Sequence, residues 1–151
     1  MDQRLDQLLA AQDGVATTDQ LMTCLTRREL AHILKTGQLQ KIWYGVYARP
    51  DPGPLTRLRA LDLTTGTRVA ACLGTAAALH GFDTEDTRDL HVLNPPRHQL
   101  RMADGLVVHR RYDAPLVMLG GRLVTAPGWT AVEVARGLHR PRALATLDAA
   151  L

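Results

Sequence analysis

The stretch TRRELAHILKTGQLQKIWYGVYAR, which begins at Thr26, constrains the fold of this chain more than any other. Thr26 stands three residues before Glu29, which is the spacing of a capping box at the start of a helix. Apolar residues then recur at helical spacing until Gly37, a residue type that commonly ends helices. The run that follows, residues 39–49, alternates and carries β-favouring side chains on both sides of Gly45, which predicts a hairpin.

Two shorter helical patterns precede this stretch. In residues 1–13 three leucines recur at helical spacing, and Gly14 follows where a C-terminal cap would stand. Thr17 and Thr18 are N-cap candidates for a second short helix. Three short helices followed by a hairpin is the order of elements in a winged helix-turn-helix.

A proline-rich segment then interrupts the pattern. Residues 50–54 contain three prolines and a glycine, and we interpret them as a linker between a winged helix-turn-helix at 1–49 and a second domain at 55–151. The second part is predicted to contain helices at 55–63, 74–82, 127–138 and 141–151, and strands at 68–73, 89–96, 105–112 and 121–127. The expected fold class is therefore α+β, with a small mixed α/β domain after the winged helix.

The third helix has one basic and one apolar face. At about 100° per residue, only the small Ala31 lies among the basic residues of one face, which are Arg27, Arg28, His32 and Lys35. Leu30, Ile33 and Leu34 fall on the opposite side. A small residue lets a helix approach base edges, and an arginine in the first turn can reach guanine, so this face is expected to read the major groove. The alternative interpretation is a solvated helix surface.

The hairpin carries residues suited to the DNA backbone. Lys41 and Arg49 can neutralise phosphates, and Tyr44 adjoins the turn glycine. At least one of Trp43 and Tyr47 is expected in the core, because aromatic residues of a small sheet usually pack against helices. We therefore interpret the hairpin as a wing that supports the third helix on duplex DNA.

Composition agrees with this interpretation without requiring it. The 151 residues carry a formal net charge of +3, and the basic residues are almost all arginine. Arginine favours bidentate phosphate and base contacts, although an arginine-rich genome would give the same composition. No apolar run is long enough to span a bilayer. Cys24 and Cys72 are isolated and lack metal-ligand spacing, which is typical of a reduced, cytoplasmic protein.

The sequence shows no assembled catalytic motif. It contains no serine, no glycine-rich phosphate loop and no Cys/His set with zinc spacing, so we expect no enzyme, no catalytic residue, no cofactor and no metal. The acidic segment Asp83–Asp89 is interpreted as a solvated turn rather than a metal site, and His80 as a helix-terminal residue that caps carbonyls. His109, Arg110 and Arg111 form either a strand end that contacts phosphate or an acidic partner, or an exposed strand end.

Several segments together resemble a known family. They are LLAAQDGV, the wing ending in GVYARP, TAAALHGF, LHVLNPPR and GRLVTAPGWTAVEVARGL, which cover nearly the whole chain. The sequence resembles the AbiEi-type antitoxin family of type IV toxin–antitoxin systems, and its actinobacterial members most of all. The resemblance implies an N-terminal winged helix that binds promoter DNA, followed by an α/β domain associated with antitoxin activity and with placing subunits on the operator. It also implies a nucleotidyltransferase-like toxin as partner.

Two positions depart from the family pattern. Cys72 and Leu73 stand where relatives often have a Ser-His pair, and Ala126 stands where a serine often precedes the proline. The second change removes a helix cap and leaves Thr125 as the nearest substitute. Many relatives also continue into a domain that resembles very-short-patch-repair endonucleases, so this chain is either a short member or a fragment of a longer one.

The sequence thus leads to one main prediction and two alternatives. The main one is a cytoplasmic DNA-binding antitoxin-like autorepressor that binds double-stranded operator DNA through Arg27, Arg28, His32, Lys35, Lys41, Tyr44 and Arg49. It would act as an oligomer on its operator and beside a toxin, away from membranes. The first alternative is the DNA-targeting N-terminal half of a repair-type endonuclease. The second is a protein-interaction module that neutralises a toxin.

Overall fold

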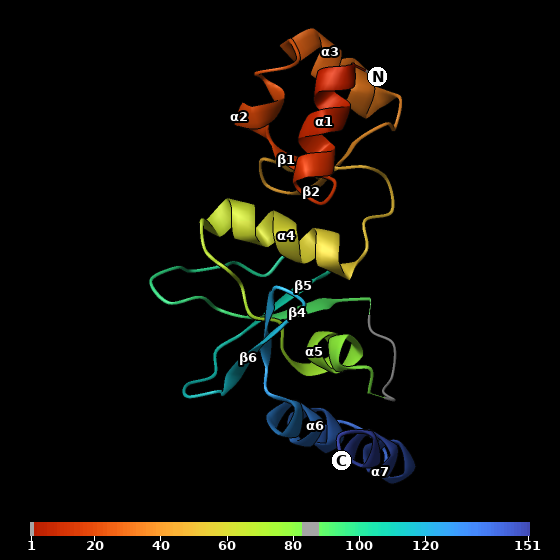
Figure 1. Ribbon diagram of the computed structural model, residues 1–151, viewed down its shortest axis with the longest axis vertical. Coiled ribbons are helices and arrows are strands. Elements are labelled where there is room, and N and C mark those ends of the chain that lie inside the picture. Colours follow the sequence, from red (N-terminus) through yellow and green to blue (C-terminus); the bar gives the residue numbers. More distant parts are fainter. Residues whose placement is uncertain (1, 83–87) are drawn as a thin grey trace. The chain divides into compact units, whose positions relative to one another are not determined.

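The computed structural model describes residues 2–82 and 88–151 (Figure 1). The chain divides into two compact units, Met1–Thr67 and Arg68–Leu151. Helices and short sheets occur in both units, which confirms the α+β class. None of the helices in the described ranges is both long and apolar enough to cross a bilayer.

The first unit is the predicted winged helix-turn-helix with one further helix. Its elements are α1 (Gln3–Ala11), β1 (Val15–Thr17), α2 (Thr18–Leu21), α3 (Arg27–Lys35), β2 (Gln40–Trp43), β3 (Val46–Ala48) and α4 (Pro54–Thr65). The three strands form an antiparallel sheet in the order β1-β3-β2. Gly14, at φ +85°, ends the first helical segment as expected, and its N–H donates to the Leu9 carbonyl.

Local capping fixes where the short helices begin. Thr17 and Thr26 both form capping boxes, with Gln20 and Glu29 respectively as the reciprocal partners. The helices enclose one apolar cluster, made of Leu5, Leu9, Ala16, Leu21, Leu25, Leu30, Ile33 and Leu39. Trp43 is buried, and Tyr47 is half-buried against this cluster, so both aromatic residues contribute to packing.

Helix α4 lies in the first unit, although we expected the first domain to end at residue 49 and the second to span 55–151. The helix contacts all three strands of the small sheet. The Trp43 Nε1–H donates to the Arg57 carbonyl at 3.2 Å, and Leu58 and Leu61 are buried. A unit of about 50 residues buries too little apolar surface to be more than marginally stable, and α4 supplies more. The prolines of the expected linker 50–54 instead lead into this helix, with Pro54 in its first turn.

Among its described residues, the second unit contains two pairs of strands joined through a single residue. β4 (Leu90–Leu93) is parallel to β5 (Leu106–His109), and β6 (Leu116–Leu119) is antiparallel to β7 (Arg122–Thr125). Ala71 bridges to Val92 on one side and to Val124 on the other. The strand expected at 68–73 is therefore reduced to one bridging residue, and β6 was not expected.

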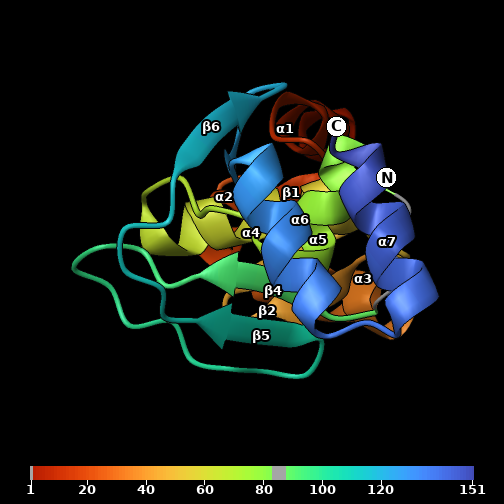
Figure 2. The same cartoon turned by 90° about the horizontal axis from the view of Figure 1, so that it is seen from below.

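In the part of this unit that the structure describes, the strands are accompanied by α5 (Leu73–His80), α6 (Pro127–Arg136) and α7 (Arg140–Ala149). α5 contacts β4 and β7, α6 packs on α5, and α7 lies beside α6 (Figure 2). His80 does not cap its own helix as expected, because its Nε2 lies 2.8 Å from the Thr125 carbonyl of β7. Nor does Thr125 replace the lost cap of α6: its hydroxyl lies 2.6 Å from that of Thr130, and α6 has no side-chain cap.

Candidate nucleic-acid interface

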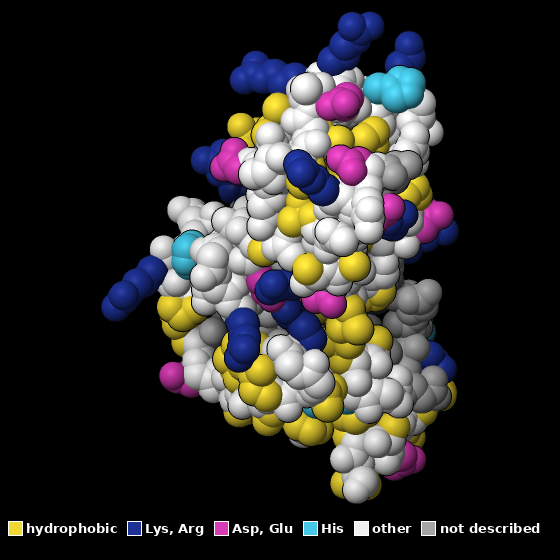
Figure 3. Space-filling model, turned by 45° about the horizontal axis from the view of Figure 1, so that its top comes forward, with side chains coloured by type: hydrophobic (Ala, Val, Ile, Leu, Met, Phe, Trp, Pro, Cys, Tyr) yellow, Lys and Arg dark blue, Asp and Glu magenta, His cyan; other side chains and the backbone are white. Residues whose placement is uncertain are grey.

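The exposed face of α3 carries the four basic residues predicted to read DNA. Arg27, Arg28, His32 and Lys35 are all exposed, as is the small Ala31 among them. Leu30 and Ile33, on the opposite face, are buried in the core of the first unit. Lys and Arg side chains, with a histidine close by, project from the end of this unit in Figure 3. The structure thus brings these four predicted residues together on one rigid element.

The capping box holds the N-terminal turn of α3 in place. The Thr26 N–H donates to Glu29 Oε2 at 2.7 Å, and the Glu29 N–H donates to the Thr26 hydroxyl oxygen at 3.2 Å. The Thr26 hydroxyl also donates to Glu29 Oε2 at 2.8 Å. The hydrogen bond from the Thr26 N–H is the main cause that lowers the pKa of the Glu29 carboxyl, and the hydrogen bond from the Thr26 hydroxyl lowers it further. Because Arg27 and Arg28 lie inside this turn, their backbone positions depend on the cap.

The wing presents a basic and an aromatic residue together. The Lys41 ammonium lies 5.3 Å from the centre of the Tyr44 ring, and Tyr44 is 89% exposed. The turn residue Gly45 has φ +69°, and its carbonyl accepts a hydrogen bond from the Thr18 N–H of α2 at 2.9 Å. The tip of the wing is therefore hydrogen-bonded to the helical part of the unit.

Arg49 lies in a different setting from the other predicted residues. Its Nη2 is 2.6 Å from Asp6 Oδ1 on α1, and both side chains are about half exposed. A phosphate would have to compete with this carboxylate for the guanidinium. The sequence pattern gave no sign of the pair, because its partners are far apart along the chain.

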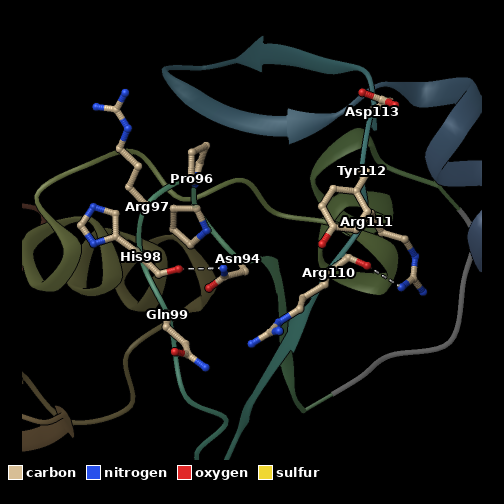
Figure 4. A pocket seen from close by; sticks show the side chains of 10 residues that line it. Asn94, Pro96, Arg97, His98, Gln99, Arg110, Arg111, Tyr112 and Asp113 are labelled. Carbon is tan, nitrogen blue, oxygen red and sulfur yellow. Dashed lines mark hydrogen bonds between the residues drawn. The ribbon is translucent and has the colours of Figure 1, made fainter.

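The second unit has an open hollow of about 540 Å³ where β4 and β5 end (Figure 4). Its lining comes from two segments, residues 94–99 after β4 and residues 110–113 after β5. Arg110 and Arg111 belong to the strand end that the sequence marks either as a contact for phosphate or an acidic partner, or as an exposed strand end. The residues of the other segment were missed, because no sequence signal showed that the two strands are parallel neighbours.

A histidine pair lies between the same two strands. His91 Nδ1 and His109 Nε2 are 2.9 Å apart, and the rings stack with their centres 5.2 Å apart. Burial is the main cause that lowers the pKa of both imidazoles. Asp89 opposes the shift at His91. At His109 the neighbouring His91 and Arg111 lower the pKa further, and Glu133 opposes them. Both rings are thus favoured in the neutral form.

The same region does not form a nucleophilic or metal centre among the residues described. Burial raises the pKa of the Cys72 thiol to about 12, with Glu133 adding to the shift, so this thiol stays protonated and unreactive. No group of three or more potential metal ligands occurs within residues 2–82 and 88–151. Asp83, Glu85 and Asp86 of the acidic segment lie outside the described residues.

Comparison with known proteins gives a family match and two similar relatives. The family model described as the AbiEi antitoxin C-terminal domain matches residues 69–151. The "Uncharacterized protein MT2308" of Mycobacterium tuberculosis strain CDC 1551 / Oshkosh is 58% identical over 127 residues, and so is the "Uncharacterized protein Rv2248" of strain ATCC 25618 / H37Rv. Each alignment covers 84% of this chain and 46% of the relative. The chain therefore spans less than half the length of these relatives.

Proposed function

Because the chain belongs to the AbiEi antitoxin family, we propose that it is an antitoxin-type repressor that binds promoter DNA through its winged helix. The family resemblance inferred from the sequence is confirmed by the match over residues 69–151. The match covers the second unit, so the proposal for the first unit depends on that unit's own geometry. The observation that carries it is the exposed basic face of α3.

The two faces of α3 have separate tasks in this proposal. Leu30 and Ile33 fix the helix to the core, so that its other face is presented without rotational freedom. Arg27 and Arg28, in the first turn, would contact guanine O6 and N7 in the major groove, since arginine is the side chain that pairs bidentately with guanine. The small Ala31 permits close approach, and His32 and Lys35 extend the contact toward the helix end.

The wing supplies contacts that do not depend on base sequence. Lys41 and Tyr44 would bind phosphate and sugar beside the groove, which orients α3 on the duplex. Arg49 would contribute by exchanging the Asp6 carboxylate for a phosphate. The protein would act in the cytoplasm, as more than one subunit on the operator and beside a nucleotidyltransferase-like toxin, and without catalytic activity of its own.

A gel-shift titration against the protein's own upstream region tests this function. The double variant Arg27→Ala/Arg28→Ala should lose specific binding, while circular dichroism and thermal unfolding stay close to wild type, because both side chains are exposed. Arg4→Ala, which removes an exposed arginine from α1, is the matched control and should bind normally. If the folded double variant binds the promoter as tightly as wild type, α3 is not the reading helix.

A second candidate is the DNA-targeting part of a longer nuclease. This chain spans 46% of its relatives, so those relatives have room for a further domain. Under this proposal α3 would still bind duplex DNA, but without preference for the upstream region of its own gene. Equal affinity for that region and for random duplex, together with plasmid cleavage by a full-length relative in Mg²⁺ or Mn²⁺, would favour the nuclease over the repressor.

A further inference from the structure

The hollow in the second unit lies where parallel strands place ligand sites in other α/β proteins. β4 and β5 pair in register from Leu90 opposite Leu106 to Leu93 opposite His109. The segments that leave their carboxyl ends, residues 94–99 and 110–113, line the hollow together. Ligands of open α/β sheets bind outside the carboxyl ends of the strands. The position alone therefore makes this hollow a candidate for a ligand unrelated to the winged helix.

The hollow contains a cation suited to a phosphate. Arg110 is exposed and forms no ion pair within the described part of the chain. Figure 4 shows its guanidinium and the Gln99 amide pointing into the space between the two segments, whereas Arg97 extends away. Arg111 is held elsewhere, because its Nε donates to Glu133 Oε1 at 2.9 Å. Arg110 is thus the guanidinium placed to bind an anion bidentately.

An aromatic ring lines the hollow together with this cation. Tyr112 lines the same hollow and is 88% exposed, so packing within the unit does not explain its position. In proteins that bind single-stranded nucleic acid, exposed aromatic rings and arginines form platforms on which bases stack, and every kind of base can stack in this way. A space of about 540 Å³ is in the size range of small-ligand sites. Asp113, the acidic residue of the lining, lies apart from Arg110 in Figure 4.

One side of the hollow is held in shape before any ligand binds. The Asn94 side chain donates through Nδ2 to the His98 carbonyl at 2.8 Å and accepts the Leu100 N–H at 2.9 Å. These two bonds close the 95–100 loop around a single side chain. A ligand therefore meets a formed surface, which reduces the ordering cost of binding.

We propose that this hollow binds a nucleotide, with the phosphate on Arg110 and the base stacked on Tyr112. The nucleotide is either a free mononucleotide or one residue of a single strand, since both present the same phosphate and base. This site is separate from the duplex-reading face of α3 and does not depend on the proposed function. It gives Arg110, at the end of β5, a specific ligand.

Binding to the full chain is measured with three probes: AMP by calorimetry, a fluorescein-labelled oligothymidine by anisotropy, and a random duplex. Loss of a base–aromatic stack weakens nucleic-acid binding about fivefold or more. Tyr112→Ala and Arg110→Ala should each produce that loss for AMP, for oligothymidine, or for both. Arg110→Lys should lie between wild type and alanine. Arg101→Ala, an exposed arginine outside the hollow, should bind like wild type.

The pattern across probes separates the two sources of nucleotide. A loss for AMP identifies a mononucleotide site, and a loss for oligothymidine alone identifies a single-strand site. Equal losses in Arg101→Ala and Arg110→Ala would show general charge attraction and overturn the proposal. So would a loss confined to the duplex, or no measurable binding of either nucleotide probe. Failure of Arg27→Ala/Arg28→Ala to affect promoter binding would leave these outcomes unchanged.

Discussion

Replacing Thr26 with alanine tests whether the capping box controls both the stability and the DNA contact of the first unit. The change removes the hydroxyl that accepts the Glu29 N–H and donates to Glu29 Oε2. The N–H of Glu29 then depends on water, and the carboxylate keeps only its bond to the Thr26 N–H. The first turn of α3, which contains Arg27 and Arg28, should fray.

The expected cost follows from helix-cap energetics. Exchanging an N-cap threonine for alanine destabilises a protein by about 1 kcal/mol, with a range of roughly 0.5–2. We expect the middle of this range or less, because Thr26 and Glu29 are exposed and water can replace part of the lost bonds. For a folding unit of this size, about 1 kcal/mol corresponds to a fall in Tm of roughly 4–8 °C.

Urea unfolding of the full chain measures this loss of stability. Amide hydrogen exchange on the folded protein then shows where in the chain the loss occurs. Protection should fall in α3 and its neighbours, and amides of the second unit should be unaffected. Thr26→Ser keeps the hydroxyl and is the matched control, with stability close to wild type. Promoter affinity should fall less in Thr26→Ala than in Arg27→Ala/Arg28→Ala, because the arginines remain and only their ordering costs more.

The pH dependence provides an internal check. The pKa of Glu29 is lowered in the folded state. The stability that the ionised Glu29 carboxylate adds is therefore complete above the ordinary glutamate pKa of 4.5, and it is lost as the pH falls through the lower folded value. The stability difference between wild type and Thr26→Ala should shrink over that acidic range. A difference that is absent at neutral pH, or that Thr26→Ser reproduces, would refute the reasoning.

Three further outcomes are expected. Lys41→Ala should weaken binding to promoter and random duplex alike, and should reduce the slope of log K against log salt by about 0.9. The pKa values of His91 and His109 are lowered in the folded protein, so the second unit should lose stability as the pH falls from about 6.5 through these lower folded pKa values. In thermal melts across this pH range, His109→Gln should lessen the loss of stability. The control His98→Gln, at an exposed histidine, should not lessen it. Leu58→Ala should lower the free energy of unfolding of the first unit by roughly 2–5 kcal/mol, so hydrogen exchange should show a loss of protection in that unit. A loss of protection confined to the second unit would show that α4 belongs to the second unit instead.

The sequence predicted the elements whose causes are local. The capping box at Thr26 depends on residues three positions apart, so the pattern specified where α3 begins. For α2 the sequence left Thr17 and Thr18 as candidate caps, and the structure has Thr17 in that role. The wing could be predicted for the same reason, because its turn needs a residue that tolerates φ +69°, and Gly45 provides it. Likewise, the helix predicted at 127–138 begins with a proline, a residue suited to the first turn, and α6 begins there at Pro127.

The elements that were missed or misplaced depend on contacts between distant residues. The prolines before α4 indicate a break in the chain, but they do not show that Trp43 will bond to the Arg57 carbonyl. β6 was missed because its four residues are all apolar, so the run has no alternating pattern, although all four are exposed in the structure. Gly120-Gly121 after it is a two-residue hairpin signal that could have revealed it. Ala71 alone bridges the two strand pairs. A single residue cannot produce an alternating pattern in the sequence, so this bridge could not be predicted.

For the candidate interfaces, the sequence predicted the side chains that share one helix and failed for those that assemble from separate segments. Helical geometry suffices to place Arg27 beside Arg28 on the exposed face. It cannot place Asp6 beside Arg49, since this pair links α1 to the end of β3. Nor can it bring Asn94 and Tyr112 to the same hollow, because that requires β4 and β5 to be parallel neighbours. The parallel register is a property of the folded second unit.

The capping box also explains how an acidic residue is tolerated within the helix that we propose reads DNA. Glu29 lies about 200° around α3 from Arg27, and its carboxylate is bonded back to Thr26. No ion pair joins it to an arginine in the described part of the chain. The negative charge thus stabilises the positive end of the helix dipole while both arginines remain available for a phosphate or a base. A lysine or alanine at this position would increase the net positive charge of the face but loosen the turn that aims it. The same two residues therefore determine where the helix begins and keep its basic face unpaired.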